Sequence, residues 1–124
     1  MSSVKIFSVD VGAVRRGMDD YARKLLATYP EVEEVVVFGS FESDTYAPGS
    51  DIDVFIVLRE ANDLPRDRIP RFLPQKSFGV PVDVFPFTRA EMEERGDSPL
   101  LVAVRKSRWR YRRAPIRLGE HTLQ

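Results

Sequence analysis

The stretch VVVFGSFESDTYAPGSDIDVFIVL, residues 35–58, decides the fold of this chain. It consists of two apolar runs joined by a polar connection that contains Pro48 and Gly49. Short apolar runs rich in β-branched residues and bounded by Gly, Pro or Ser indicate buried strands, and a Pro-Gly pair indicates a turn. We therefore expect strands over 34–38 and 51–58, with a short helix or loop and then a turn over 41–50.

Two carboxylates, Asp51 and Asp53, stand at the beginning of the second expected strand. Because side chains alternate along a strand, both point to one face, which Phe55 and Val57 continue as core, while Ile52 and the even-numbered residues after it fill the opposite face. Two strand steps of about 3.3 Å separate the two Cβ atoms by about 6–7 Å. At an effective dielectric constant of about 20, two unit charges at that distance repel by roughly 2.5 kcal/mol. A divalent cation would relieve this repulsion, and Mg²⁺ prefers such hard oxygen ligands.

A third acid, Asp83, interrupts the apolar run 80–87, which we expect to form another strand. If that strand lies beside the one that begins with Asp51 and Asp53, the three carboxylates form one cluster. Three acids can bind two divalent ions about 3.5–4 Å apart, the arrangement that serves phosphoryl transfer. Simpler interpretations stay open, because an Asp-x-Asp pair is common at surfaces and in calcium loops, and Asp83 alone could be a salt-bridged acid at a strand edge.

Gly39 and Ser40 end the first apolar run. A glycine at a strand end lets the backbone approach a phosphate closely, and the N–H groups of a turn or helix start point toward anions. Ser40 adds a hydroxyl donor. We assign Gly39 and Ser40, together with Ser50 just before the acids, to nucleotide binding, although a Gly-Ser pair alone is common.

Taken together, these residues resemble the DNA polymerase β-like nucleotidyltransferases, in particular their minimal stand-alone type. The family pattern is an apolar strand, Gly-Ser, a short connection, Asp-x-Asp in a second strand and a third acid in a later strand. The resemblance covers residues 10–111, nearly the whole chain. It implies a nucleotidyltransferase fold of the α/β or α+β class, with a small mixed β-sheet and helices packed on it.

The resemblance also implies an activity, the transfer of a nucleoside monophosphate from a nucleoside triphosphate to a hydroxyl, with release of pyrophosphate. Asp51 and Asp53 would then bind two Mg²⁺ or Mn²⁺ ions. Asp83 would bind the ion that activates the acceptor and would take the acceptor's proton. Gly39 and Ser40 would hold the β- and γ-phosphates.

Minimal members of that family are often encoded beside a helical HEPN-type protein and act as antitoxins, some by adenylylating that partner. By this resemblance we expect ATP as the donor and a HEPN-type partner that completes the acceptor site. Nucleic acid is a less favoured partner, and self-association stays open. A second function competes with the enzymatic one: a catalytically weak module of this fold that binds and neutralises or scaffolds a partner protein.

One departure from the family pattern bears on activity. Many relatives follow Gly-Ser with small residues and arginines, whereas this chain has Phe41-Glu42-Ser43-Asp44. Glu42 and Asp44 would repel a triphosphate. Either cations from elsewhere in the chain offset them, or the chain is the binding module.

The rest of the chain predicts helices and one further strand. Capping and spacing signals indicate a helix from Asp10 to about Pro30, a short one that starts at Asp63 and Pro65, one capped by Thr88 and Glu91, and one that starts at Ser98 and Pro99. Alternation of Arg with Trp109 and Tyr111 indicates an edge strand over 108–112. We expect a weak extended segment at 4–9, a single domain over 1–124 with its core at about 10–112, and a loose tail over 113–124.

Every charged residue from Arg105 to Arg117 is basic. The simplest interpretation is a solvated edge strand that arginines protect from aggregation. The alternatives are a surface for an acidic partner or RNA, and the source of the missing phosphate-binding cations.

Composition excludes several other classes. Of the 124 residues, 43% are hydrophobic and 31% are charged, which is ordinary for one globular domain. Lys plus Arg equals Asp plus Glu at 19 each, so no net charge attracts nucleic acid or membranes. The chain has no cysteine, which excludes disulfides, thiolate catalysis and cysteine zinc sites. Since neither a membrane span nor a secretory pattern is found, we expect a cytoplasmic protein.

Overall fold

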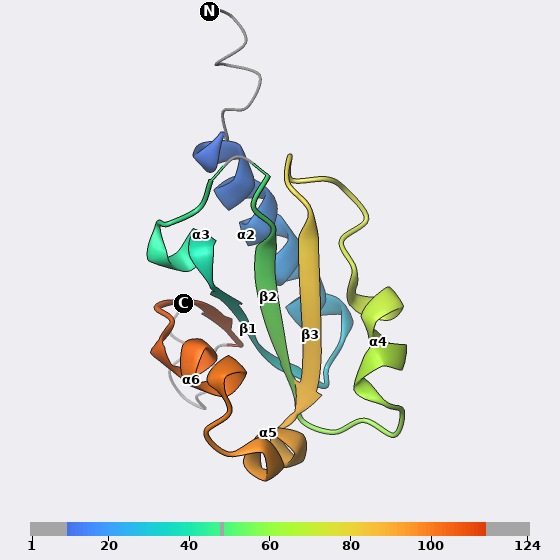
Figure 1. Ribbon diagram of the computed structural model, residues 1–124. Coiled ribbons are helices and arrows are strands. Elements are labelled where there is room, and N and C mark those ends of the chain that lie inside the picture. The colour runs from blue at the N-terminus through green and yellow to red at the C-terminus, as the bar shows by residue number, and fades with distance from the viewer. Residues whose placement is uncertain (1–9, 48, 114–124) are drawn as a thin grey trace, which may run out of the picture.

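The computed structural model describes residues 10–47 and 49–113. Its centre is a four-stranded sheet with the order β3-β2-β1-β4. The strands are β1 (Val32–Phe38), β2 (Ile52–Leu58), β3 (Val82–Thr88) and β4 (Trp109–Arg112). Strand β1 pairs antiparallel with both β2 and β4, whereas β2 pairs parallel with β3. The expected small mixed sheet is therefore confirmed (Figure 1).

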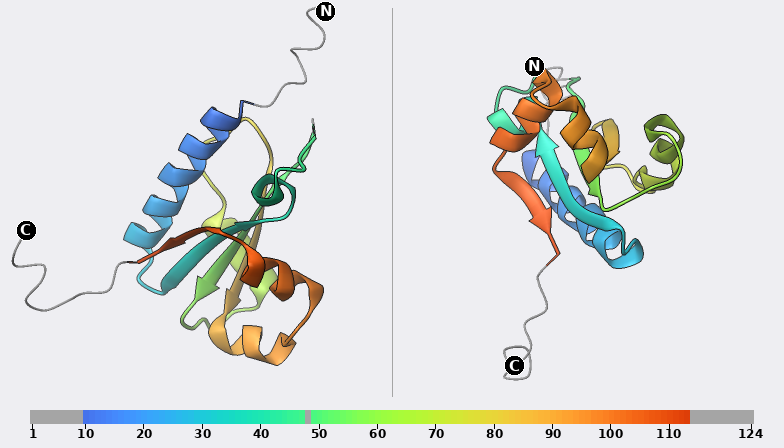
Figure 2. Two further views of the ribbon diagram at one scale, coloured as in Figure 1. Left: turned by 90° about the vertical axis from the view of Figure 1, so that its left-hand side faces the viewer. Right: turned by 90° about the horizontal axis from the view of Figure 1, so that it is seen from below.

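Helices cover the sheet on both sides (Figures 1 and 2). Helix α2 (Val11–Thr28) lies along one face, and α6 (Pro99–Lys106) packs on the other face after the short helix α5 (Arg89–Arg95). Helix α4 (Pro65–Phe72) connects β2 to β3 and lies beside β3, and the one-turn helix α3 (Ser40–Ser43) follows β1. None of the helices in the described residues is long and apolar enough to span a membrane.

The alternation expected along β2 is confirmed by the packing. Ile52 and the following even-numbered residues of β2 belong to the apolar cluster with α2. Phe55 and Val57 belong to the cluster on the opposite face, which Leu101 and Val104 of α6 complete. Asp53 shares the face of Phe55 and Val57, so the acidic end of β2 lies on the face away from α2.

Local capping signals also form as expected. The Asp10 carboxylate accepts from Ala13 N at 3.0 Å at the start of α2. Thr88 and Glu91 form the capping box of α5, in which Glu91 N donates to Thr88 Oγ1 at 3.1 Å and Thr88 N donates to Glu91 Oε1 at 2.8 Å. These caps could be predicted from the sequence because each joins residues only three positions apart.

Several boundaries differ from expectation. Strand β1 begins two residues earlier, at Val32, and β3 runs from Val82 to Thr88 instead of 80–87. Asp51 lies just before β2, whose first residue, Ile52, donates its N–H to Pro81 O at 2.9 Å. The segments expected at 4–9 and beyond Arg113 lie outside the described residues.

Asp63 has a role different from a helix start. The N-cap of α4 is Leu64, without a side-chain cap, and Pro65 is the first helical residue. The Asp63 carboxylate instead accepts from Arg68 Nε and from Arg71 Nη1, each at 3.1 Å. The Asp-x-Pro pattern thus marked the region correctly, but the acid serves as an ion-pair partner.

Arg68 joins α4, β3 and α5 from inside the protein. Its side chain is 1% exposed. The guanidinium donates to both carboxylate oxygens of Glu91, at 2.7 and 2.9 Å, and to the carbonyl of Pro86 in β3 at 3.1 Å. A buried guanidinium with fully paired donors fixes geometry strongly, because a two-pronged Arg–carboxylate pair allows little rotation. Arg68 therefore holds α4, the helix that connects β2 to β3, against the edge strand β3.

We predict that Glu91→Gln lowers the free energy of unfolding by about 2–3 kcal/mol at pH 7, because it removes one of the two carboxylates that pair with the buried Arg68 charge and leaves only Asp63. The hydrogen bonds from Arg68 hold the pKa of Glu91 at about 2, below its ordinary value. A carboxylate with a lowered folded pKa stabilises the protein fully above its unfolded pKa of about 4.3, and this contribution disappears as pH falls toward the folded value.

Urea unfolding of both proteins between pH 7 and pH 3 checks this prediction. The stability difference between them should shrink as pH falls below about 4.3. Glu94→Gln, at an exposed position of the same helix, is the matched control and should change little. A difference that stays constant over the whole pH range would contradict the assignment.

Candidate functional site

Two of the three predicted acids lie side by side where β2 and β3 begin. The parallel register pairs Asp53 with Asp83, and on the other side Asp53 pairs with Phe38 at the end of β1. Neighbouring strands are about 4.8 Å apart, and paired residues of parallel strands point to the same face. The condition set by the sequence, that the strand of Asp83 lies beside that of Asp53, is therefore met.

Burial and the charges of neighbouring acids raise the pKa values of both carboxylates. Burial raises the pKa of Asp53 first, and the charges of Asp83 and Asp51 raise it further. The pKa of Asp83 is raised by burial and then by a hydrogen bond and charge repulsion with Asp51. Among the described residues, no Lys, Arg or His forms an ion pair with any of the three acids.

The three acids do not form a closed metal-binding shell as they stand. Within residues 10–47 and 49–113, no group of three or more Asp, Glu or His side chains is arranged to hold a metal ion. The donor chemistry nevertheless suits a hard divalent cation, since all the ligands are carboxylates whose mutual repulsion such an ion would offset. Asp51 and Asp83 are exposed, so the acids are open to solvent and to a ligand.

The Gly39–Ser40 turn lies directly against Asp53. Gly39 has φ +81° and ψ −150°, a conformation that side chains disfavour. A Cβ atom on this residue would lie only 2.6 Å from Asp53 Oδ2. The Ser43 hydroxyl also donates to Gly39 O at 3.0 Å and so helps to hold the turn. Glycine is required here both for its backbone angle and for the closeness of the carboxylate.

Ser50 closes the turn that leads into the acids. Its Oγ accepts from Ala47 N at 2.8 Å, and its own N–H donates to Ala47 O at 2.9 Å. The sequence assigned Ser50 to nucleotide binding, and these two hydrogen bonds hold it in the turn just before Asp51. Ser43 contributes to the turn in a comparable way and was not among the expected residues.

Aromatic side chains form the floor below the acids. Phe55 and Phe85 follow Asp53 and Asp83 on the same face by two residues, and Phe38 lies next to Asp53. The ring of Phe38 is 5.4 Å from that of Phe85 and 6.5 Å from that of Phe55. This apolar floor excludes water from one side of the acids, which accounts for the part that burial plays in raising the Asp53 pKa.

The two acids that follow Ser40 where relatives have other residues, Glu42 and Asp44, occupy different positions. Glu42 is half-buried, and its Oε2 accepts the backbone N–H of Arg108 at 3.4 Å. Asp44 is exposed and ends the helix with φ +65°. Glu42 is therefore directed at the segment that enters β4, whereas Asp44 projects at the surface.

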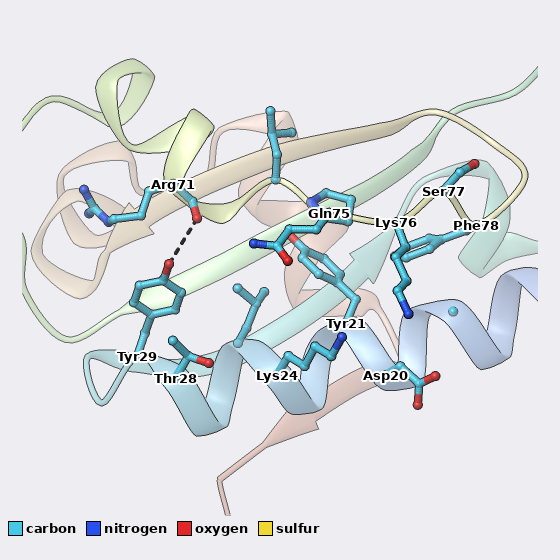
Figure 3. A pocket seen from close by; sticks show the side chains of 14 residues that line it. Asp20, Tyr21, Lys24, Thr28, Tyr29, Arg71, Gln75, Lys76, Ser77 and Phe78 are labelled. Atoms are coloured by element: carbon cyan, nitrogen blue, oxygen red, sulfur yellow. Dashed lines mark hydrogen bonds between the residues drawn. The ribbon is translucent and has the colours of Figure 1, made fainter.

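A separate groove lies on the α2 face of the molecule (Figure 3). It has a volume of about 370 Å³ and runs between α2 and residues 71–78. Tyr29 donates its hydroxyl to Arg71 O at 3.3 Å along one wall, and Tyr21 donates to Phe72 O. Asp20 is the only acid among the lining residues. Because the catalytic candidates lie outside this lining and on the opposite face of the sheet, the groove is not the site of the acids.

Comparison with known proteins found a family model that matches most of this chain. The family model of the nucleotidyltransferase domain matches residues 18–112, a range that includes Gly39, Ser40 and all three acids. Among solved structures, the chain is similar to a Sulfolobus solfataricus protein provisionally described as a nucleotidyltransferase, with 25% identity over 68% of this chain and 78% of that one. The TM-score of this pair is 0.47, so the family assignment rests on the domain match alone. No curated protein matches this chain.

We predict that Gly39→Ala destabilises the protein by about 1–3 kcal/mol through its strained backbone, and by about 1 kcal/mol more through overlap with the Asp53 carboxylate. Gly79→Ala is the matched control, because Gly79 has φ +94° but a Cβ atom added there would have no neighbour within 4 Å. Thermal or urea unfolding measures the loss of stability in both variants. Equal losses in the two variants would show that the contact with Asp53 has no energetic effect.

Proposed function

Because the chain belongs to the nucleotidyltransferase domain family, we propose that it transfers a nucleoside monophosphate, with ATP as the favoured donor, to a hydroxyl on a partner protein. One observation carries the proposal. The parallel register sets Asp53 beside Asp83, and the Gly39 turn touches Asp53. Acidic side chains and a turn suited to phosphate therefore occupy one end of the sheet.

In this proposal Asp51, Asp53 and Asp83 bind two Mg²⁺ or Mn²⁺ ions. When bound, such ions neutralise phosphate charge and lower the pKa of an attacking oxygen. The backbone of Gly39 and Ser40 holds the β- and γ-phosphates, and the aromatic floor of Phe38, Phe55 and Phe85 shields the acids from water on one side. A shielded site strengthens each electrostatic contact with the phosphates.

The chemical step is an in-line displacement at phosphorus. The acceptor oxygen forms a bond to the α-phosphorus, and the bond from that phosphorus to the pyrophosphate oxygen breaks. Pyrophosphate leaves with the electron pair of the broken bond, and the acceptor's proton passes to the Asp83 carboxylate. Asp83 suits this role because it is exposed at the start of β3, where an acceptor can approach.

A protein acceptor fits the openness of this end of the sheet. Asp51 and Asp83 are both exposed at this end. A bulky acceptor can therefore reach the acids without an opening motion. The resemblance to minimal antitoxin-type nucleotidyltransferases favours a helical HEPN-type partner.

Two observations favour the competing function, a weakly catalytic module that acts by binding its partner. Glu42 and Asp44 stand where many relatives have cationic residues. In addition, the three acids of the described chain do not close into a metal-binding shell. Under this alternative the fold presents a surface to the partner, and the acids have no catalytic task.

Transfer of label from α-³²P-ATP to the co-expressed partner in the presence of Mg²⁺ tests the proposed function. We expect transfer by the wild type, and Asp53→Asn should reduce its rate at least 100-fold, as loss of a central electrostatic group does. The matched control is Asp44→Asn, which keeps an Asx residue at φ +65° and removes an acid outside the trio. If no nucleotide is transferred while Asp51→Asn and Asp53→Asn both keep partner binding, the binding module is the correct function.

Charge repulsion gives a second prediction, on stability. Two carboxylates about 5 Å apart repel by about 1–3 kcal/mol at effective dielectric constants between about 20 and 80. In EDTA, Asp53→Asn should therefore raise the melting temperature by about 4–12 °C. With 10 mM Mg²⁺ the wild type should be stabilised and the variant should not. An identical response of the two proteins to Mg²⁺ would exclude Asp53 as a ligand.

A further inference from the structure

The contacts in the structure differ among the basic residues in and around β4. Six of them lie between residues 105 and 113: Arg105, Lys106, Arg108, Arg110, Arg112 and Arg113. The sequence left open whether they protect a sheet edge, bind an acidic partner or supply the cations missing after Gly39-Ser40. Their contacts now separate those with a structural role from those without one.

Arg110 and Arg112 neutralise a buried acid of β1. Each donates its Nε to Glu34 Oε2 at 2.7 Å, and the Glu34 side chain is only 8% exposed. Burial alone would raise the pKa of Glu34, but the hydrogen bonds of Arg112 and Arg110 outweigh it and lower the pKa. These two arginines hold the edge strand in place, so they are not available for a ligand.

Two further arginines are also occupied. Arg105 donates to Asp97 Oδ1 at 2.7 Å and to Gly96 O at 2.9 Å. Arg113 donates to the carbonyls of Tyr29 and Val32 at 3.2 and 2.9 Å. Within the described parts of the chain, the side chains of Lys106 and Arg108 form neither an ion pair nor a hydrogen bond.

Arg108 lies in line with the acids. Trp109 pairs with Val37, so the residue before it lies beside Phe38, which itself pairs with Asp53. The order across the sheet at this level is therefore Asp83, Asp53, Phe38 and Arg108. Ser107 has extended backbone angles, and alternation places Arg108 on the face of Arg110, which is also the face of Asp53.

A contact with α3 also helps to hold Arg108 in this position. The backbone N–H of Arg108 donates to Glu42 Oε2 at 3.4 Å, and the segment from α6 into β4 passes close to α3 (Figure 1). Two strand spacings, about 10 Å, separate the backbones of Arg108 and Asp53. An arginine side chain is long enough to reach across much of that gap toward Asp53 and the Gly39 turn.

We propose that Arg108 binds the phosphates of the donor nucleotide and replaces the arginines that many relatives carry directly after Gly-Ser. The proposal rests on the proposed function and assigns a residue of that same site. A guanidinium suits the task because its planar donors match two phosphate oxygens at once. Arg108 is exposed and unpaired in the described chain, so binding a phosphate breaks no structural contact.

Binding of ATP and of adenosine in the presence of Mg²⁺ tests the proposal, measured by isothermal titration calorimetry. Arg108→Met should weaken ATP binding about 10- to 100-fold, the loss expected for a charge-assisted hydrogen bond, and leave adenosine binding unchanged. Arg108→Lys should recover part of the affinity, because it restores the charge without the planar fork. Lys106→Met, which removes the other unpaired basic residue among residues 105–113, is the matched control and should bind ATP like the wild type.

The outcomes separate this proposal from the proposed function. If the wild type binds ATP and Arg108→Met binds it equally well, Arg108 has no role in phosphate binding, and the proposed function still stands. If the wild type does not bind ATP at all, the proposed role of Arg108 and the proposed function are both wrong. Weaker binding of ATP and adenosine alike in Arg108→Met would indicate a structural role only and would overturn the proposal, as would a melting temperature well below that of the wild type.

Discussion

The parallel, in-register pairing of β2 with β3 is the constraint on which the site depends. It aligns seven residues of each strand and sets Asp53 beside Asp83 at the end where both strands begin. A shift of one residue would turn one of these acids to the α2 face, because side chains alternate. The register in turn depends on the crossover through α4, and Arg68 fixes that helix to Pro86 of β3 and to Glu91 of α5.

The acids are tolerated because the rest of the sheet is well packed. Each residue of β2 after Asp53 is buried, from Val54 to Leu58, and the faces of this strand contact two separate apolar clusters. The unfavourable features gather at one end, where Gly39 has a positive φ and the pKa values of Asp53 and Asp83 are raised. Concentrated strain and uncompensated charge of this kind are typical of functional sites, where stability is given up for chemistry.

Local patterns could be predicted from the sequence, and long-range partners could not. The two faces of β2 and the capping box at Thr88 depend on residues a few positions apart, whereas Asp53 and Asp83 come together only through the pairing of β2 with β3. Likewise, Arg68 meets Glu91 across 23 residues, and Arg110 meets Glu34 across 76. A periodic pattern in the sequence does not indicate which charged residues pair over such separations. The basic segment before and within β4 therefore had three open interpretations until the contacts of each arginine were known, and Asp63 was expected to start a helix but binds Arg68 instead.

The central claim, that Asp51, Asp53 and Asp83 share a divalent cation, is tested most directly by paramagnetic Mn²⁺ in an NMR spectrum of the ¹⁵N-labelled protein. We expect the amide signals of Gly39, Asp53 and Asp83 to broaden first, and the effect to disappear in Asp83→Asn. Broadening centred on the groove beside α2, or unchanged broadening in that variant, would contradict the claim.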